Sequence, residues 1–162
     1  ETKNSKAMHH TFKANVNWSI NQGESTLNPR TFSRNHEVLI ANKTSALQVS
    51  AAKPFRGDAS LYNPEDLLLS ALASCHMMSY LYVCAQNNIE VLRYTDHAEG
   101  DLEVQASGSG SFITVRLQPI VTIKDASKKA LALALHQQAN ALCFIANSCN
   151  FPISHEATIL VE

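Results

Sequence analysis

The feature that most restricts the fold is one long apolar segment in the middle of the chain. Residues 67–85 are mostly leucine, alanine, methionine and other apolar types, interrupted only by serines and one histidine. Asn63 can cap free N–H groups, Pro64 suits the first helical position, and the two carboxylates that follow favour the positive end of the helix dipole. The sequence therefore predicts a helix from residue 63 to about residue 87.

This helix is apolar on nearly every face, which predicts a central, enclosed position. Its polar interruptions, its place in mid-chain and the lack of flanking basic residues argue against a membrane span. One small sheet in a chain of 162 residues cannot cover such a helix on all sides. We therefore expect a homodimer and no association with a membrane.

Alternation of apolar and polar residues predicts β-strands on both sides of the helix. Before it, strands are expected at residues 11–20, 36–41 and 46–51. After it, we expect β segments at 90–106 and 112–124 joined by a hairpin at 107–110, a second helix from 125 or 127 to about 146, and a terminal strand at 155–161. The order β-β-β-α-β-β-α-β predicts an α+β fold in which antiparallel sheets surround two helices.

The composition predicts one globular domain over residues 1–162, with residues 1–10 as a flexible tail. Hydrophobic residues make up 45% and charged residues 17%, which argues against disorder. The net charge of −1 and the absence of a Lys/Arg cluster exclude a nucleic-acid partner. The first ten residues contain no secretory apolar region, so we expect a cytoplasmic protein.

Four cysteines, Cys75, Cys84, Cys143 and Cys149, are expected to be reduced thiols rather than a disulfide framework. Cys75 and Cys143 are each expected on an apolar helix. Packed helices lie about 8–10 Å apart, so cysteines at the same level can form a disulfide if their Cα atoms come within roughly 7 Å. Such a pair allows one thiolate to become a sulfenic acid that the second thiol resolves. The alternative is that both cysteines simply fill the core.

Zinc is the main rival interpretation of these residues. Cys75, His76, Cys143, Cys149 and His155 are of the right ligand types. No Cys-x-x-Cys is present, however, and adjacent residues on a helix point about 100° apart. No P-loop, dinucleotide fingerprint or nucleophile elbow occurs either. The sequence therefore predicts neither a metal site nor a bound cofactor.

A reactive thiol in an apolar pocket needs a cation that stabilises its thiolate. Arg56 is the first candidate, followed by Lys53 and Arg34, although a loop arginine is usually just solvated. Glu65 could orient such an arginine by a bidentate contact, or only compensate the helix dipole. Glu65 precedes Cys75 by ten residues, about 15 Å along a helix, so it cannot reach its own Cys75 sulfur. A site containing both residue types is therefore expected to include the partner subunit.

These segments resemble the OsmC/Ohr family, the osmotically inducible and organic hydroperoxide resistance proteins. The resemblance lies in Phe55-Arg56-Gly57, Asn63-Pro64-Glu65-Asp66-Leu67-Leu68 and Ala71-Leu72-Ala73-Ser74-Cys75-His76-Met77. Cys143-Phe144-Ile145-Ala146-Asn147-Ser148, followed by Asn150-Phe151-Pro152, looks like a distinct branch of the family. The order of strands and helices agrees over nearly the whole chain.

The resemblance implies an intertwined homodimer whose long central helices are wrapped by sheets from both chains. It also implies reduction of organic hydroperoxides, and less efficiently hydrogen peroxide. Cys75 matches the family's peroxidatic cysteine, Cys143 the resolving one, and Glu65 the glutamate that pairs with a catalytic arginine. The family's reductants are dithiols such as lipoyl groups on carrier proteins, with no bound cofactor.

The sequence departs from the family pattern at two places. Phe144 follows Cys143 where proline is usual, and Arg56 lies just after the phenylalanine where some relatives place arginine just before it. Cys149 is an additional thiol that could compete as resolver. The alternative function is a non-enzymatic member that binds an apolar ligand, or senses oxidation, in the same pocket.

Overall fold

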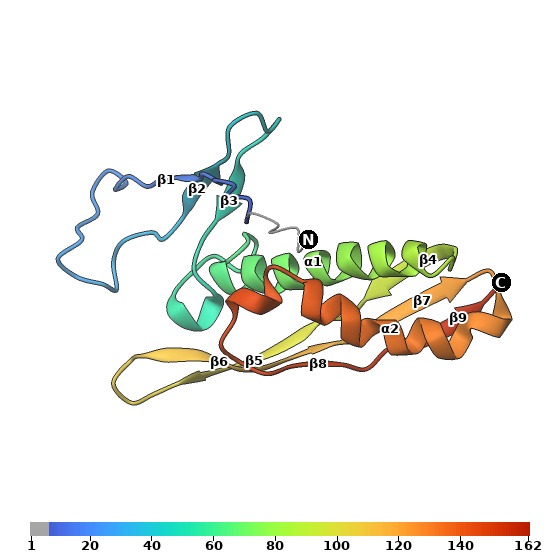
Figure 1. Cartoon of the computed structure of the whole chain (residues 1–162). Coiled ribbons are helices and arrows are strands. Elements are labelled where there is room, and N and C mark those ends of the chain that lie inside the picture. Colours follow the sequence, from blue (N-terminus) through green and yellow to red (C-terminus); the bar gives the residue numbers. More distant parts are fainter. Residues whose placement is uncertain (1–6) are drawn as a thin grey trace. The chain divides into compact units, whose positions relative to one another are not determined.

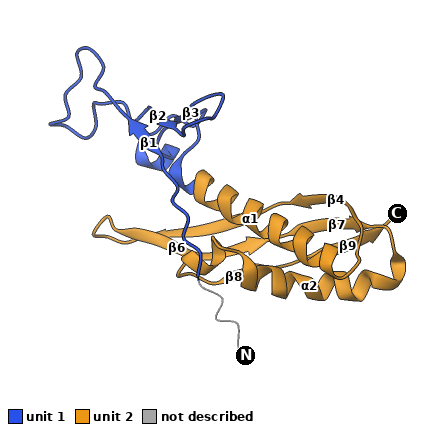
Figure 2. Ribbon diagram, turned by 45° about the horizontal axis from the view of Figure 1, so that its top comes forward, with its two compact units in different colours: residues 1–65 blue, residues 66–162 orange. Residues whose placement is uncertain are grey.

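The computed structural model describes residues 7–162. Of the predicted tail 1–10, residues 1–6 lie outside the described residues, and residues 7–10 form neither helix nor strand. The chain divides into two compact units, one up to Glu65 and one from Asp66 to Glu162 (Figure 2). We refer to them as unit 1 and unit 2.

Unit 1 contains a small antiparallel sheet in the order β1-β2-β3 (Figure 1). Its strands are β1 (Asn15–Asn17), β2 (His36–Leu39) and β3 (Leu47–Val49), followed by the 3₁₀ helix η1 (Lys53–Phe55). All three strands occur where the sequence predicted them. β1 is much shorter than predicted, because only its residues 15–17 find pairing partners, on β2.

Gly57 allows the loop after η1 to return closely to the end of β3. A Cβ atom at this position would lie only 1.6 Å from the carbonyl oxygen of Ala51, so no other residue fits without a backbone shift. The Gly57 N–H also donates to the Ala52 carbonyl at 3.2 Å. This close approach fixes the turn that carries Phe55 and Arg56.

The predicted long helix is confirmed as α1 (Pro64–Gln86). It ends where Asn88 adopts a left-handed conformation with φ of 53°, a common way to terminate a helix. The Ile89 N–H then donates to the Cys84 carbonyl, and Lys128 Nζ donates to the carbonyls of Asn87 and Asn88.

Unit 2 contains two three-stranded sheets, ordered β4-β7-β9 and β5-β6-β8. The strands are β4 (Val91–Asp96), β5 (Glu99–Val104), β6 (Gly110–Leu117), β7 (Pro119–Ile123), β8 (Ile153–His155) and β9 (Thr158–Val161). Each predicted β segment after α1 is thus two strands, because the chain passes from one sheet to the other within it.

The α+β class is confirmed, but the sheets are mixed rather than wholly antiparallel. β4 pairs with β7, and β5 with β6, in antiparallel fashion. β8 pairs in parallel with β6, and β9 with β7. The parallel pairing follows from the second helix. It runs back along the sheets, so the strands after it enter the sheets from the same end as β6 and β7, as in a strand–helix–strand crossover.

The second helix is shorter than predicted. Asp125 caps the 3₁₀ turn η2 (Ala126–Lys128) by accepting from the Ser127 N–H, and α2 (Lys129–Leu142) follows. Cys143 therefore does not lie within the helix; it ends it, in an extended conformation with φ of −72° and ψ of 111°. A further 3₁₀ turn, η3 (Ala146–Ser148), follows. The apolar pattern continues past residue 142 because Cys143 is buried and Ile145 and Ala146 pack against the core, whereas Phe144 is 82% exposed.

Only one face of α1 is buried within the chain, so the prediction of an enclosed helix is wrong for a single copy. Leu72, His76, Tyr80, Val83 and Cys84 are buried, and they pack against α2 and the sheets of unit 2 (Figure 1). The opposite face leaves Met78 and Tyr82 each 58% exposed. By length and composition alone α1 could cross a membrane, but the core helix of a soluble protein passes the same test.

Candidate active site

Cys75 and Cys143 come together in unit 2. Cys143 is fully buried in a cluster with Leu72, Val115 and Leu117, and half-buried Cys75 packs against this cluster. The two thiols interact directly, with Cys75 as a hydrogen-bonding partner of Cys143. Both are free thiols. Cys75 and Cys143, which are 68 positions apart in the sequence, are therefore neighbours. Formation of a disulfide between them requires this proximity.

The two thiols differ in their surroundings. Burial raises the pKa of Cys143 to about 11, and its hydrogen bond to Cys75 acts in the same direction. The Ala146 N–H, 3.4 Å from Cys143 Sγ, opposes this effect. Cys143 therefore holds its proton at neutral pH. Such a thiol is a poor first nucleophile but is positioned to react with a modified Cys75.

Cys75 borders an apolar groove of about 420 Å³ in unit 2. The other residues of the groove are Met78, Ser79, Tyr82, Leu142 and Phe144. An organic molecule with an apolar body could reach the Cys75 sulfur from this side.

The other two cysteines lie in less reactive settings. Cys84 is fully buried beside Tyr80, and burial raises its pKa. Burial also raises the pKa of half-buried Cys149. Neither environment supplies a positive group that would generate a thiolate.

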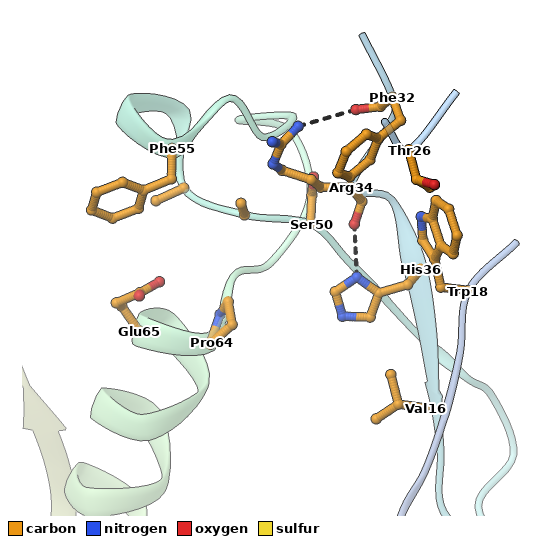
Figure 3. A pocket seen from close by; sticks show the side chains of 12 residues that line it. Val16, Trp18, Thr26, Phe32, Arg34, His36, Ser50, Phe55, Pro64 and Glu65 are labelled. Atoms are coloured by element: carbon orange, nitrogen blue, oxygen red, sulfur yellow. Dashed lines mark hydrogen bonds between the residues drawn. The ribbon is translucent and has the colours of Figure 1, made fainter. Parts of the chain in front are cut away.

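Unit 1 contains a separate apolar cavity of about 470 Å³ (Figure 3). Its walls include the aromatic side chains of Trp18, Phe32 and Phe55. Two side chains of opposite charge, Arg34 and Glu65, border the same cavity. The cavity therefore combines apolar walls with one cation and one carboxylate, a combination suited to an amphipathic ligand.

Arg34 is held by its own loop. Its guanidinium donates to the carbonyls of Phe32, at 3.0 Å, and Pro29, at 2.5 Å, and its Cζ lies 4.7 Å from the centre of the Phe32 ring. Glu65 Oε2 is buried and has no hydrogen-bond partner among the described residues. A buried carboxylate oxygen without a donor is costly, so this atom is expected to accept a hydrogen bond in the working protein.

Arg56, the first cation predicted from the sequence, does not line this cavity. It is exposed, ends η1 and has a left-handed φ of 66°. Lys53 is also exposed. Of the three proposed cations, only Arg34 borders the cavity with Glu65. The sequence could not rank Arg34 first, because 31 residues separate it from Glu65 and no local pattern links them.

Four aromatic rings, three of them buried, form a stack in unit 2 that was not predicted from the sequence. The Tyr80 and His136 rings lie 3.9 Å apart, His136 and His76 5.3 Å, and His76 and His155 4.4 Å, measured between ring centres. A 3.0 Å hydrogen bond joins His76 Nε2 and His136 Nδ1. These histidines come from α1, α2 and β8, so their spacing in the sequence gives no signal of the cluster.

Burial, together with the neighbouring His155, lowers the pKa of His76 to about 3 and that of His136 to about 4. The rings are therefore neutral at physiological pH. Within residues 7–162, no three histidine, cysteine, aspartate or glutamate side chains are arranged to hold a metal ion.

Comparison with known proteins identifies the family. A model of the OsmC-like protein family matches residues 57–158, more than half of the chain, and the chain belongs to this family. A search of the curated proteins gives no match.

Solved structures confirm the OsmC-like fold. An OsmC-like protein of unknown function from Vibrio cholerae is 29% identical, with a TM-score of 0.82 over 93% of this chain and 100% of that one. An organic hydroperoxide resistance protein from Elizabethkingia anophelis is 18% identical, with a TM-score of 0.66 over 97% and 100%. The organic hydroperoxide resistance protein OhrB of Bacillus subtilis is 18% identical, with a TM-score of 0.59 over 91% and 98%.

The neutral histidine stack predicts a loss of stability in acid. The folded-state pKa values of His76 and His136 lie below the ordinary value of 6.5, so their contribution is complete above pH 6.5 and is lost as the pH falls toward 4. Between pH 7.5 and pH 5 the free energy of unfolding should fall by roughly 2 kcal/mol for each of the two. Chemical denaturation at both pH values measures this fall.

Because burial raises the pKa of Asp96, that group changes stability in the opposite direction, and a variant is needed to isolate the histidines. His136→Phe should reduce the acid-dependent loss, whereas His10→Phe, at an exposed position, should leave it unchanged. Equal losses in the wild type and His136→Phe would contradict the interpretation.

Proposed function

We propose that the protein is a cysteine-dependent peroxidase that reduces organic hydroperoxides, and hydrogen peroxide less well, in defence against oxidative stress. The observation that carries the proposal is the contact between two thiols of unequal burial, half-buried Cys75 and fully buried Cys143. Cys75 is the peroxidatic cysteine and Cys143 the resolving one. The names of the relatives from Elizabethkingia anophelis and Bacillus subtilis, which are organic hydroperoxide resistance proteins, support the same function.

The reaction has two steps in the oxidative half. The Cys75 thiolate attacks the outer oxygen of the hydroperoxide; an S–O bond forms, the O–O bond breaks, and the alkoxide takes a proton and leaves as an alcohol. Cys143 then gives up its proton, and its sulfur attacks the Cys75 sulfenic acid. An S–S bond forms, the S–O bond breaks, and the hydroxyl group leaves as water.

We propose Arg34, rather than Arg56, as the cation of this site, with Glu65 as its partner. Arg34 and Glu65 border one cavity, and the buried oxygen of Glu65 needs a donor. Guanidinium and carboxylate groups pair in bidentate fashion and present remaining N–H groups to a peroxide oxygen. Because Glu65 cannot reach the Cys75 of its own helix, the proposed site joins Arg34 and Glu65 of one protomer with the cysteines of the other.

The substrate class follows from the apolar surfaces. The groove beside Cys75 and the walls of the unit 1 cavity are both mainly apolar. Apolar walls favour a hydroperoxide with an alkyl or aryl body, which gains free energy on leaving water. Hydrogen peroxide has no such group and is expected to bind more weakly.

Turnover requires a reductant, and we propose a dithiol, such as a lipoyl group on a carrier protein. One thiolate of the reductant attacks the Cys75–Cys143 disulfide, and its second thiol then releases both cysteines while the reductant becomes a disulfide. The protein needs no bound cofactor in this scheme. Its four free thiols suit a reducing compartment, and we propose the cytoplasm.

The cavity of unit 1 also favours a second candidate function. A 470 Å³ cavity with aromatic walls could bind an apolar ligand without any reaction at the cysteines, or serve a sensor of oxidation. Catalytic turnover separates the two candidates, because a binding protein or a sensor reacts at most once.

The first prediction from the proposed function concerns the cysteines. Purified protein with a dithiol reductant should consume cumene hydroperoxide over many turnovers, with a higher kcat/KM than for hydrogen peroxide. Cys75→Ser should abolish consumption, because it removes the sulfur that is oxidised first. Cys143→Ser should retain one rapid turnover but lose cycling through the intramolecular disulfide. If Cys75→Ser consumes peroxide at the original rate, the proposed mechanism is wrong.

The second prediction compares two arginines. Arg34→Gln should lower kcat/KM roughly a hundredfold, the usual loss when one preorganised donor is removed from an active site. Arg56→Gln is the matched control and should stay close to the wild type, because Arg56 is exposed and outside the cavity. Steady-state peroxide consumption measures both. If Arg56→Gln lowers kcat/KM and Arg34→Gln does not, Arg56 is the cation of the site.

The third prediction concerns the homodimer. The exposed apolar face of α1 requires cover, and a second copy of the chain supplies an apolar surface of the same kind. Sedimentation equilibrium should give twice the mass of the chain. Met78→Glu should weaken the dimer by placing a charge on this face, whereas Leu131→Glu, on the exposed side of α2, should not. A monomeric wild-type protein would contradict both the dimer and the shared site.

A further inference from the structure

Side-chain contacts along α2 and at its end join it to α1 in unit 2. The Tyr80 hydroxyl donates to the Ala132 carbonyl at 2.9 Å, His76 Nε2 and His136 Nδ1 share a 3.0 Å hydrogen bond, and Cys75 meets Cys143. Along this series the numbering falls on α1 and rises on α2, so the two helices run antiparallel. The histidine bond lies between the other two contacts, next to the thiol pair.

We propose that His76 and His136 are positioning residues for disulfide formation between Cys75 and Cys143, an inference that rests on the proposed peroxidase function. His76 directly follows Cys75 on α1. His136 precedes Cys143 by seven residues, about two helical turns, so both lie toward the same side of α2. The hydrogen bond between the two imidazoles therefore fixes the position of α2 along the axis of α1. It does so close to the end of α2, where Cys143 follows.

The composition of α2 explains why a directional contact is needed there. Its sequence, Lys-Ala-Leu-Ala-Leu-Ala-Leu-His-Gln-Gln-Ala-Asn-Ala-Leu, places small alanines between the larger side chains. Alanine packing permits helices to slide past each other more easily than interlocking large side chains do. A hydrogen bond between two rings that are 1% and 3% exposed favours one register, because sliding the helices would leave both buried nitrogens without a partner.

The step that depends on this register is the second one of the proposed reaction. Cys143 loses its proton, its sulfur bonds to the Cys75 sulfur, and the hydroxyl of the sulfenic acid leaves as water. Attack requires the two sulfurs in line at short distance, and small misplacements slow such reactions strongly. The first step does not use the Cys143 sulfur, so it depends much less on how α2 lies along α1.

The neighbouring rings make a clean substitution possible. His136 stacks on Tyr80 and on His76, so phenylalanine at 136 keeps an aromatic ring in the stack while it removes the hydrogen bond to His76. His155→Phe is the matched control, since His155 also stacks on His76, without a hydrogen bond between the two rings in the described structure. His136→Asn is the conservative variant, because its amide group lies near the place of Nδ1.

The experiment separates the two steps by rapid mixing with cumene hydroperoxide, followed by trapping of sulfenic acid and of free thiols. His136→Phe should slow formation of the Cys75–Cys143 disulfide about fivefold, the equivalent of one hydrogen bond, and leave Cys75 oxidation within about twofold of the wild type. The sulfenic acid should persist longer. His155→Phe should match the wild type in both steps, and His136→Asn should recover part of the loss. If His136→Phe fails to fold, His136→Leu takes its place.

A second measurement keeps this inference separate from the peroxidase proposal. In glutathione redox buffers, the effective concentration of Cys143 toward Cys75 should be about fivefold lower in His136→Phe than in the wild type, whatever the protein does with peroxide. An unchanged effective concentration, or equal slowing of both oxidation steps, overturns the positioning role. Failure of the wild type to consume peroxide overturns the proposed function, and the glutathione measurement still decides the role of the histidines.

Discussion

The packing of α1 against α2 is the interaction on which the rest of unit 2 depends. The buried face of α1 supplies Tyr80, Val83 and Cys84 to one core cluster and Leu72 to the other. Because burial of this face brings Cys75 and Cys143 together, the proposed chemistry depends on the packing of the core. The helix is long enough to extend beyond this contact, and its first residues contribute Pro64 and Glu65 to the cavity of unit 1.

Unequal burial gives the two thiols different surroundings. Cys143 ends α2 in an extended conformation, and this places its sulfur inside the core, where burial keeps it protonated. Cys75 stays half-buried beside an apolar groove. Two equally buried thiols would be inert, and two equally exposed thiols would react without selectivity. The unequal burial therefore suits the proposed division into a peroxidatic and a resolving cysteine.

The sequence predicted well what depends on local patterns. The start of α1 at Pro64, its length and the α+β class follow from capping residues and apolar periodicity, and the structure confirms them. The end of α2 could not be predicted, because the apolar residues after Leu142 suit a helix as well as a buried turn. The split of the longer β segments and the parallel pairing of β8 and β9 also depend on contacts between distant segments.

In the candidate site, too, the residues marked by a local pattern were predictable and those joined by distant contacts were not. Cys75 and Cys143 were predictable as a pair because each lies in a distinctive motif. Arg34 and the histidine stack were not, since their partners are 31 to 79 residues away and no local pattern marks them. Arg56, favoured for its place in a motif, is exposed and outside the cavity that holds Arg34 and Glu65.

The most direct test of the central claim is to map the disulfide formed after one equivalent of an organic hydroperoxide. Digestion of the oxidised protein and mass spectrometry of its peptides identify which cysteines are joined. The account predicts a bond between Cys75 and Cys143 of one chain, with Cys84 and Cys149 still free. A bond from Cys75 to Cys149, or oxidation that leaves Cys75 a free thiol, would contradict it.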